Sequence, residues 1–75
     1  MKFNEIVRAL REDREPKTTQ KDVAEALNTT QRKISRLETG EAEPNIEDLR
    51  MLSRYYNVSA DYLLGISHDM PHPKR

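Results

Sequence analysis

The sequence predicts an all-α domain of five helices, and three observations carry that prediction. Apolar residues recur at helical spacing, as Phe3, Ile6, Val7 and Leu10 do at the start of the chain. No segment alternates apolar and polar residues over several positions, which argues against strands. Residues typical of helix caps and helix ends, including both glycines, fall between the periodic segments. We therefore expect a compact helical domain.

The size and composition of the chain narrow the class of protein further. Its 75 residues make 8.8 kDa, enough for one small domain. There is no cysteine, so disulfides and thiolate metal sites are excluded. No run of 18 apolar residues and no apolar leader is present, so we expect a cytoplasmic protein without a membrane partner. With 13 basic and 13 acidic residues the net charge is zero, which argues against binding by bulk positive charge.

The first two helices are bounded by a proline and by a capping pattern. The apolar stripe predicts a helix over 2–13, which must end before Pro16. In the next segment Thr19 is followed three positions later by Asp22, which fits a capping box. The second helix is therefore expected over 20–27, and Val23, Ala24 and Leu27 form its apolar face.

A three-residue turn separates the second helix from the third. Asn28 tolerates a left-handed backbone, Thr30 is a suitable cap, and Gly40 is a suitable helix end. We thus expect a helix over 31–39, joined to its predecessor as a tight, steeply angled pair.

Two further helices follow from the same kind of signal. Asn45 after Pro44 predicts a capped helix over 46–56. The turn 57–59, with Ser59 as the cap, predicts a short helix over 60–64 that Gly65 ends. The domain should span 1–65, and the segment 66–75 should be a mobile tail. The expected core comprises Val7, Leu10, Val23, Ala24, Leu27, Ile34, Leu37, Leu49, Leu52 and Leu63.

These segments resemble the lambda repressor/Cro-like (XRE) helix-turn-helix family. The resemblance rests on residues 19–28 and 30–40, on Pro44-Asn45-Ile46 with Leu49, and on residues 57–65. It covers about residues 3–65 and implies a five-helix DNA-binding domain, usually of a dimeric transcriptional repressor. Antitoxins and phage lysogeny regulators use the same domain.

The chain departs from the family pattern in three ways. Asn28 replaces the usual glycine of the turn, which its tolerance of a left-handed backbone makes conservative. Thr29 stands where a buried aliphatic residue is usual, so the turn should pack less tightly. Glu41 and Glu43 follow the third helix where basic residues are common, and acids there would repel phosphate.

The charge pattern also points to nucleic acid. Residues 16–36 hold five basic and two acidic side chains, a net charge of +3, and they include the second and third helices. Residues 37–48 hold five acids and no base, a net charge of −5. A basic segment over the paired helices is the electrostatic pattern expected of a DNA-binding surface.

The helical wheel and the resemblance together identify candidate residues for contacts with DNA. On the third helix Ile34 and Leu37 define the buried side, so the opposite side and its flanks are free to reach bases. The candidates for base contacts are Gln31, Arg32, Ser35 and Arg36. The family places a phosphate-binding glutamine at the start of the second helix, and helix N-termini favour anions. The candidates for phosphate contacts are Lys17, Gln20, Lys21, Thr30, Lys33 and Asn45.

The partner of the domain is expected to be double-stranded DNA carrying an inverted-repeat operator, bound by a homodimer. Apolar residues that are not easily placed in the core predict the dimer interface: Met51, Tyr55, Tyr62 and Ile66, with Met70 beyond them. Two alternatives stay open at this point, an antitoxin that also binds a toxin, and a protein-interaction module that no longer binds DNA. Zero net charge and the acidic loop favour the interaction module.

An enzyme is not expected. His68 and His72 are the two histidines, and Pro71 prevents the helix that would place them on one face. There is no glycine-rich phosphate loop and no Ser/His/acid set. We expect no cofactor and no metal.

Overall fold

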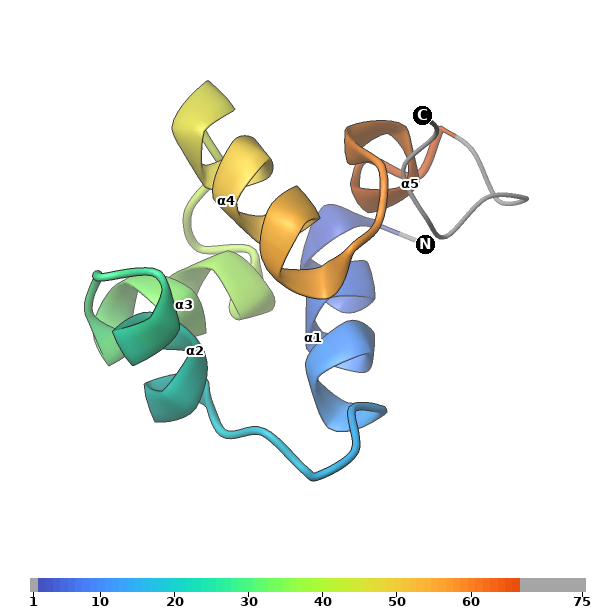
Figure 1. Ribbon diagram of the computed structural model, residues 1–75. Helices are drawn as coiled ribbons and strands as arrows, with labels where there is room; N and C mark the ends of the chain where they lie inside the picture. The colour runs from blue at the N-terminus through green and yellow to red at the C-terminus, as the bar shows by residue number, and fades with distance from the viewer. Residues whose placement is uncertain (1, 67–75) are drawn as a thin grey trace.

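The computed structural model describes residues 2–66 of the chain as five α-helices (Figure 1). The helices are α1 (Phe3–Glu12), α2 (Gln20–Ala26), α3 (Gln31–Thr39), α4 (Ile46–Tyr56) and α5 (Ala60–Leu63). All five fall where the sequence places them, with ends that differ by at most one residue. The expectations for residues 67–75, which include Met70 and both histidines, lie outside the described part of the chain.

The predicted caps form at the starts of α2, α3, α4 and α5. The side chains of Thr19, Thr30, Asn45 and Ser59 each accept a hydrogen bond from the backbone N–H three residues later. Such caps satisfy N–H groups that have no partner within the helix. Local side chains therefore fix these four helix starts, and at α1 the Glu5 carboxylate accepts a hydrogen bond from the Lys2 N–H at 2.9 Å.

Left-handed residues follow the ends of α2 and α3. Asn28 in the α2–α3 turn has φ of 57°, and Gly40 after α3 has φ of 87°. Asparagine tolerates this conformation and glycine adopts it without a steric cost. The turn thus closes as predicted, and α2 and α3 form a helix-turn-helix pair.

The helices enclose a core of two adjoining clusters. The larger joins α1, α3, α4 and α5 through Ile6, Val7, Leu37, Leu52, Val58 and Leu63. The smaller lies between α2 and α3 around Val23, Ala24 and Ile34, and Leu27 and Tyr56 pack against both clusters. In Figure 1, α1 lies between the α2–α3 pair and α5, and it contacts both α3 and α5.

The core differs from the expected set: Ile6 and Val58 also belong to it, while Leu10, Leu27 and Leu49 are only partly buried and pack against it. Val58 is 2% exposed although it lies in the α4–α5 turn, where no periodicity identifies a buried residue. Ile46, which extends the apolar stripe of α4, is 77% exposed. It is the first residue of α4, and helical side chains lean toward the N-terminus, so its side chain projects beyond the packed part of the helix.

Candidate nucleic-acid interface

The outer side of α3 carries the side chains proposed to read bases. Gln31, Arg32 and Arg36 are exposed, Ser35 is partly exposed, and Ile34 is buried. Thr30 begins the helix, and its hydroxyl accepts a hydrogen bond from the Lys33 N–H at 3.1 Å. The wheel therefore separates the buried and exposed sides of α3 as expected, and base contact by the exposed side stays a prediction.

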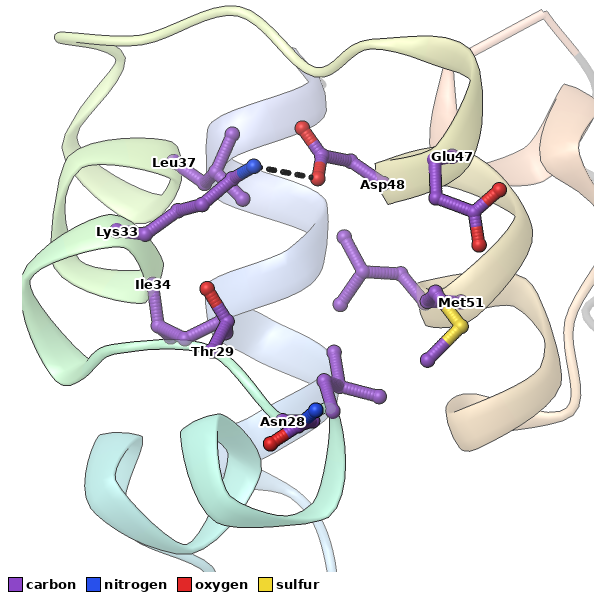
Figure 2. A pocket seen from close by; sticks show the side chains of 10 residues that line it. Asn28, Thr29, Lys33, Ile34, Leu37, Glu47, Asp48 and Met51 are labelled. Atoms are coloured by element: carbon purple, nitrogen blue, oxygen red, sulfur yellow. Dashed lines mark ion pairs between the residues drawn. The ribbon is translucent and has the colours of Figure 1, made fainter.

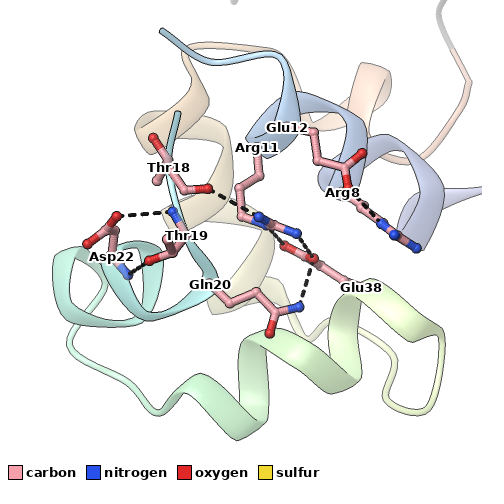
Figure 3. A network of polar contacts seen from close by, with 8 residues as sticks. All are labelled: Arg8, Arg11, Glu12, Thr18, Thr19, Gln20, Asp22 and Glu38. Carbon is pink, nitrogen blue, oxygen red and sulfur yellow. Dashed lines mark hydrogen bonds and ion pairs between the residues drawn. The ribbon is translucent and has the colours of Figure 1, made fainter. Parts of the chain in front are cut away.

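The start of α2 is a closed capping box rather than a row of free donors. The Thr19 N–H donates to the Asp22 carboxylate at 3.0 Å, and the Asp22 N–H donates to the Thr19 hydroxyl at 3.1 Å (Figure 3). The hydrogen bond from the Thr19 backbone, with that from its side chain, lowers the pKa of Asp22. Two N–H groups at this end are thus already paired, while the Lys17 and Lys21 side chains are exposed.

A buried carboxylate behind the surface was missed by the sequence analysis. Glu38 counts as one of the five acids in segment 37–48, yet it is 5% exposed. Its two oxygens accept hydrogen bonds from the Arg11 guanidinium at 2.8 and 3.0 Å, and a third from the Gln20 amide at 3.0 Å (Figure 3). One sequence feature could have identified Glu38 as buried: it lies four residues after Ile34, on the buried side of α3.

The Arg11–Glu38 pair joins α1 to α3 and also reaches the segment before α2. The Arg11 guanidinium donates a further hydrogen bond to the Thr18 carbonyl at 3.1 Å. Hydrogen bonding to Glu38 raises the pKa of Arg11. The acidic segment is therefore less negative at its surface than the sequence count of −5 indicates, because one of its charges is buried and neutralised.

An ion pair connects α3 to the first turn of α4. The Lys33 ammonium lies 2.9 Å from the Asp48 carboxylate, whose side chain is 13% exposed (Figure 2). Asp48 also accepts a hydrogen bond from the Asn45 N–H at 3.0 Å and donates its own N–H to the Asn45 side chain at 2.7 Å. Lys33 and Asn45, two candidates for phosphate contacts, are thus linked through one carboxylate.

Two hollows lie on either side of this ion pair. One, of about 220 Å³, lies between the α2–α3 turn and α4 and is lined by Leu27, Thr29, Ile34, Met51 and others (Figure 2). Its position beside Thr29 agrees with the expected loose packing of the turn. The other, of about 340 Å³, follows the outer side of α3. Its lining holds three cations, two acids and the cap of α4, among other residues: Arg32, Lys33, Arg36, Glu43, Asp48 and Asn45.

The acidic loop after α3 approaches the exposed side of that helix. The Glu41 carboxylate lies 3.9 Å from the Arg36 guanidinium, and both side chains are about half exposed or more. An exposed pair at this distance is weak and is screened by salt. Arg36 is therefore available to another anion.

The residues proposed for a dimer interface differ in how much of each side chain already packs against the rest of this chain. Tyr55 packs on the smaller core cluster, edge-on to Tyr56 at 4.9 Å, with the Arg14 guanidinium 4.2 Å from its ring centre. Tyr62 is partly buried on the larger cluster, and Met51 lines the hollow beside Thr29. Ile66 is 69% exposed and Leu64, which was not predicted, is 43% exposed.

Residues 2–66 offer no features of a metal site or a membrane span. That part of the chain holds no group of three histidine or acidic side chains able to bind a metal. None of its helices is long and apolar enough to cross a membrane. Burial raises the pKa of the Tyr56 phenol, so this hydroxyl carries no charge at neutral pH.

Comparison with known proteins finds two bacterial relatives that match this chain in part. The transcriptional activator BcrR of Enterococcus faecalis is 38% identical over 65 residues, which are 87% of this chain and 31% of BcrR. The transcriptional regulator ImmR of Bacillus subtilis is 47% identical over 47 residues, 63% of this chain and 37% of ImmR. The chain thus spans about a third of the length of the curated relatives it matches.

A solved structure matches almost the whole chain. The P22 c2 repressor, crystallised with synthetic operator 9T in the presence of Tl⁺, superposes with a TM-score of 0.79 and 33% sequence identity. The match covers 89% of this chain and 98% of the repressor chain. A family model described as helix-turn-helix matches residues 7–63. With this match and the lambda-repressor-like fold, the chain belongs to the helix-turn-helix family.

Proposed function

We propose that this domain binds operator DNA with α3 in the major groove and the start of α2 on the sugar–phosphate backbone. The observation that carries the proposal is the division of α3 into a buried and an exposed side. Ile34 and Leu37 hold the helix to the core, while Gln31, Arg32 and Arg36 extend outward. The likeness to a repressor crystallised on operator DNA supports the same docking.

The chemistry of the exposed side chains suits their proposed roles. Arginine pairs with the O6 and N7 atoms of guanine, and glutamine with the N6 and N7 atoms of adenine. We therefore assign base contacts to Gln31, Arg32, Ser35 and Arg36. Lysines, hydroxyls and capped helix ends bind phosphate oxygens, which fix the position of the protein without reading sequence. These contacts are assigned to Lys17, Gln20, Lys21, Thr30, Lys33 and Asn45.

The whole regulator is proposed to act as a repressor that occupies its operator in the bacterial cytoplasm, where the chromosome lies. A homodimer would bind an inverted repeat whose half-site centres are about 10–10.5 base pairs apart. Symmetry of the protein then matches symmetry of the operator. The exposed Ile66 and Leu64 supply apolar surface for the subunit contact.

The proposal is tested by titrating labelled duplexes from the promoter of the protein's own gene and following fluorescence anisotropy. We expect tighter binding to a promoter fragment than to a scrambled duplex, with both affinities falling as salt rises. Arg32→Ala should reduce this preference, and Arg54→Ala, an exposed change on α4, should leave it unchanged. Equal binding to all duplexes, or none at low salt, would overturn the proposal.

A protein-interaction module is the second candidate, and a particular observation favours it. Lys33 and Arg36 on α3 both face acids of the chain itself, Asp48 at 2.9 Å and Glu41 at 3.9 Å. Lys33, held at the shorter distance by a largely buried carboxylate, is less free to bind phosphate, and the acids near Arg36 oppose an approaching phosphate. Absence of DNA binding at low salt, with the fold intact, would select this alternative.

A further inference from the structure

The buried Glu38 carboxylate gathers polar groups from three helices. Arg11 comes from α1, Gln20 is the first residue of α2, and Glu38 itself lies near the end of α3. Glu38 has a side-chain exposure of 4% and Arg11 of 13%. Gln20 is only partly buried, so it is the member of the network that reaches the surface proposed to face DNA (Figure 3).

The chemistry of these groups fixes which way the Gln20 amide points. A carboxylate only accepts hydrogen bonds, so the amide nitrogen, rather than the amide oxygen, must face Glu38. Figure 3 shows the nitrogen directed at Glu38 and the oxygen directed away from it. The amide nitrogen has two hydrogens and Glu38 takes one, which leaves the second N–H for another acceptor.

The charge of Glu38 does not oppose an anion at this place. Arg11 binds both carboxylate oxygens, so the buried pair is neutral as a unit. A phosphate next to Gln20 would therefore meet a held N–H donor and no uncompensated negative charge. A glutamine that is held before binding also loses less rotamer freedom when it contacts DNA.

We infer that Glu38 is a positioning residue for DNA binding, which holds the Gln20 amide so that its second N–H donates to a backbone phosphate. The inference rests on the proposed function and deepens it. Glu38, a buried acid behind the exposed surface, thereby controls one phosphate contact.

The main experiment is a double-mutant cycle on DNA affinity. Wild type, Gln20→Ala, Glu38→Gln and the double variant are titrated against one promoter duplex, at a temperature where circular dichroism shows each variant folded. A neutral glutamine at 38 can present either its oxygen or its nitrogen to Gln20, so the orientation is no longer fixed. We expect each single variant to weaken binding roughly tenfold, and Glu38→Gln to have little further effect once Gln20→Ala is in place.

The control separates positioning from simple loss of stability. Val58→Ala removes methyl groups from the larger core cluster, in the α4–α5 turn away from this network. It should lower stability while its effect on DNA affinity, if any, adds to that of Gln20→Ala. If Glu38→Gln weakens DNA binding by the same factor in the wild type and in the Gln20→Ala variant, Glu38 has only a structural role and the inference is wrong.

A second measurement needs no variant and no DNA. The ¹⁵N relaxation of the Gln20 side-chain amide in the free wild-type protein should give an order parameter above about 0.6, as for an ordered group. A value typical of an exposed, mobile side chain would overturn the inference even if Glu38→Gln does not fold. Failure of the wild type to bind any duplex is a different result, because it would reject the proposed function itself.

Discussion

Single side chains on the exposed side of this domain should divide into those that read sequence and those that add affinity. Arg32→Ala should cost about 1–3 kcal/mol on the operator and relax preference at one base position. Lys17→Ala should weaken binding to all sequences alike and reduce the slope of log affinity against log salt by about one. Both residues are exposed, so the free energy of unfolding should hardly change. Identical behaviour of the two variants on operator and random duplexes would contradict the assigned roles.

Thr29 offers a test of packing at the turn. It lines the hollow of about 220 Å³ together with Leu27 and Ile34, and a methyl group suits these two apolar neighbours better than a hydroxyl. Thr29→Val should therefore raise the free energy of unfolding by about 1 kcal/mol. The neighbouring Thr30→Val is the matched control, because it removes the cap of α3 and should lower stability by about 1 kcal/mol. Chemical denaturation measures both, and a loss of stability in Thr29→Val would contradict the prediction.

The capping box of α2 makes the free energy of unfolding depend on pH. The lowered pKa of Asp22 means that folding favours its charged form. Its stabilising effect is present above the unfolded pKa of about 4 and is lost as pH falls through the lower folded value. Asp22→Asn should therefore be less stable than wild type at pH 7, and the difference should shrink toward pH 2. Urea unfolding of both proteins between pH 7 and pH 2 measures this difference. A difference that does not change with pH would show that the carboxylate charge is not involved.

The acidic loop between α3 and α4 is expected to restrain affinity for DNA. Glu41 and Glu43 are exposed, and Glu41 lies near Arg36. Replacing both by lysine should tighten binding to any duplex, and the gain should fall as salt rises. Anisotropy titrations at two salt concentrations measure the effect. No gain at low salt would show that the loop lies away from DNA.

The helices show how far the sequence determines this fold. Caps and periodicity act locally, so Thr19, Thr30, Asn45 and Ser59 could be identified without knowing what packs on what. Glu38 could not be paired with Arg11, because 27 positions separate them and only the crossing of α1 and α3 brings them together. The Lys33–Asp48 pair was missed for the same reason. Exposure of the α3 face was predictable from the wheel, whereas the contacts that orient Gln20 and Lys33 depend on the assembled helices.

At the scale of the whole molecule, assembly should depend on the surface beyond α5. Ile66→Asp changes an exposed side chain without disturbing the core, unlike a change at the partly buried Tyr62. It should shift the protein toward monomer and weaken binding to the two-half-site operator more than to a single half-site. Sedimentation velocity, with and without DNA, measures the shift.

Ile46→Asp is the matched control, since this isoleucine is also exposed but begins α4. It should leave the sedimentation coefficient unchanged. If Ile46→Asp dissociates the dimer and Ile66→Asp does not, the subunit contact lies at the start of α4 instead.

The buried Glu38 also limits what a protein engineer could transplant from this domain. Residues 19–40 carried alone into a foreign scaffold would bring a carboxylate without the guanidinium that neutralises it, because Arg11 belongs to α1. Such a graft would have to hydrate that charge or supply a new cation, and an unpaired buried charge is strongly destabilising. Exchanging Gln31, Arg32, Ser35 and Arg36 in place leaves the buried pair intact. The transferable unit is thus a small set of outward side chains, and the helix pair that displays them is not portable without α1.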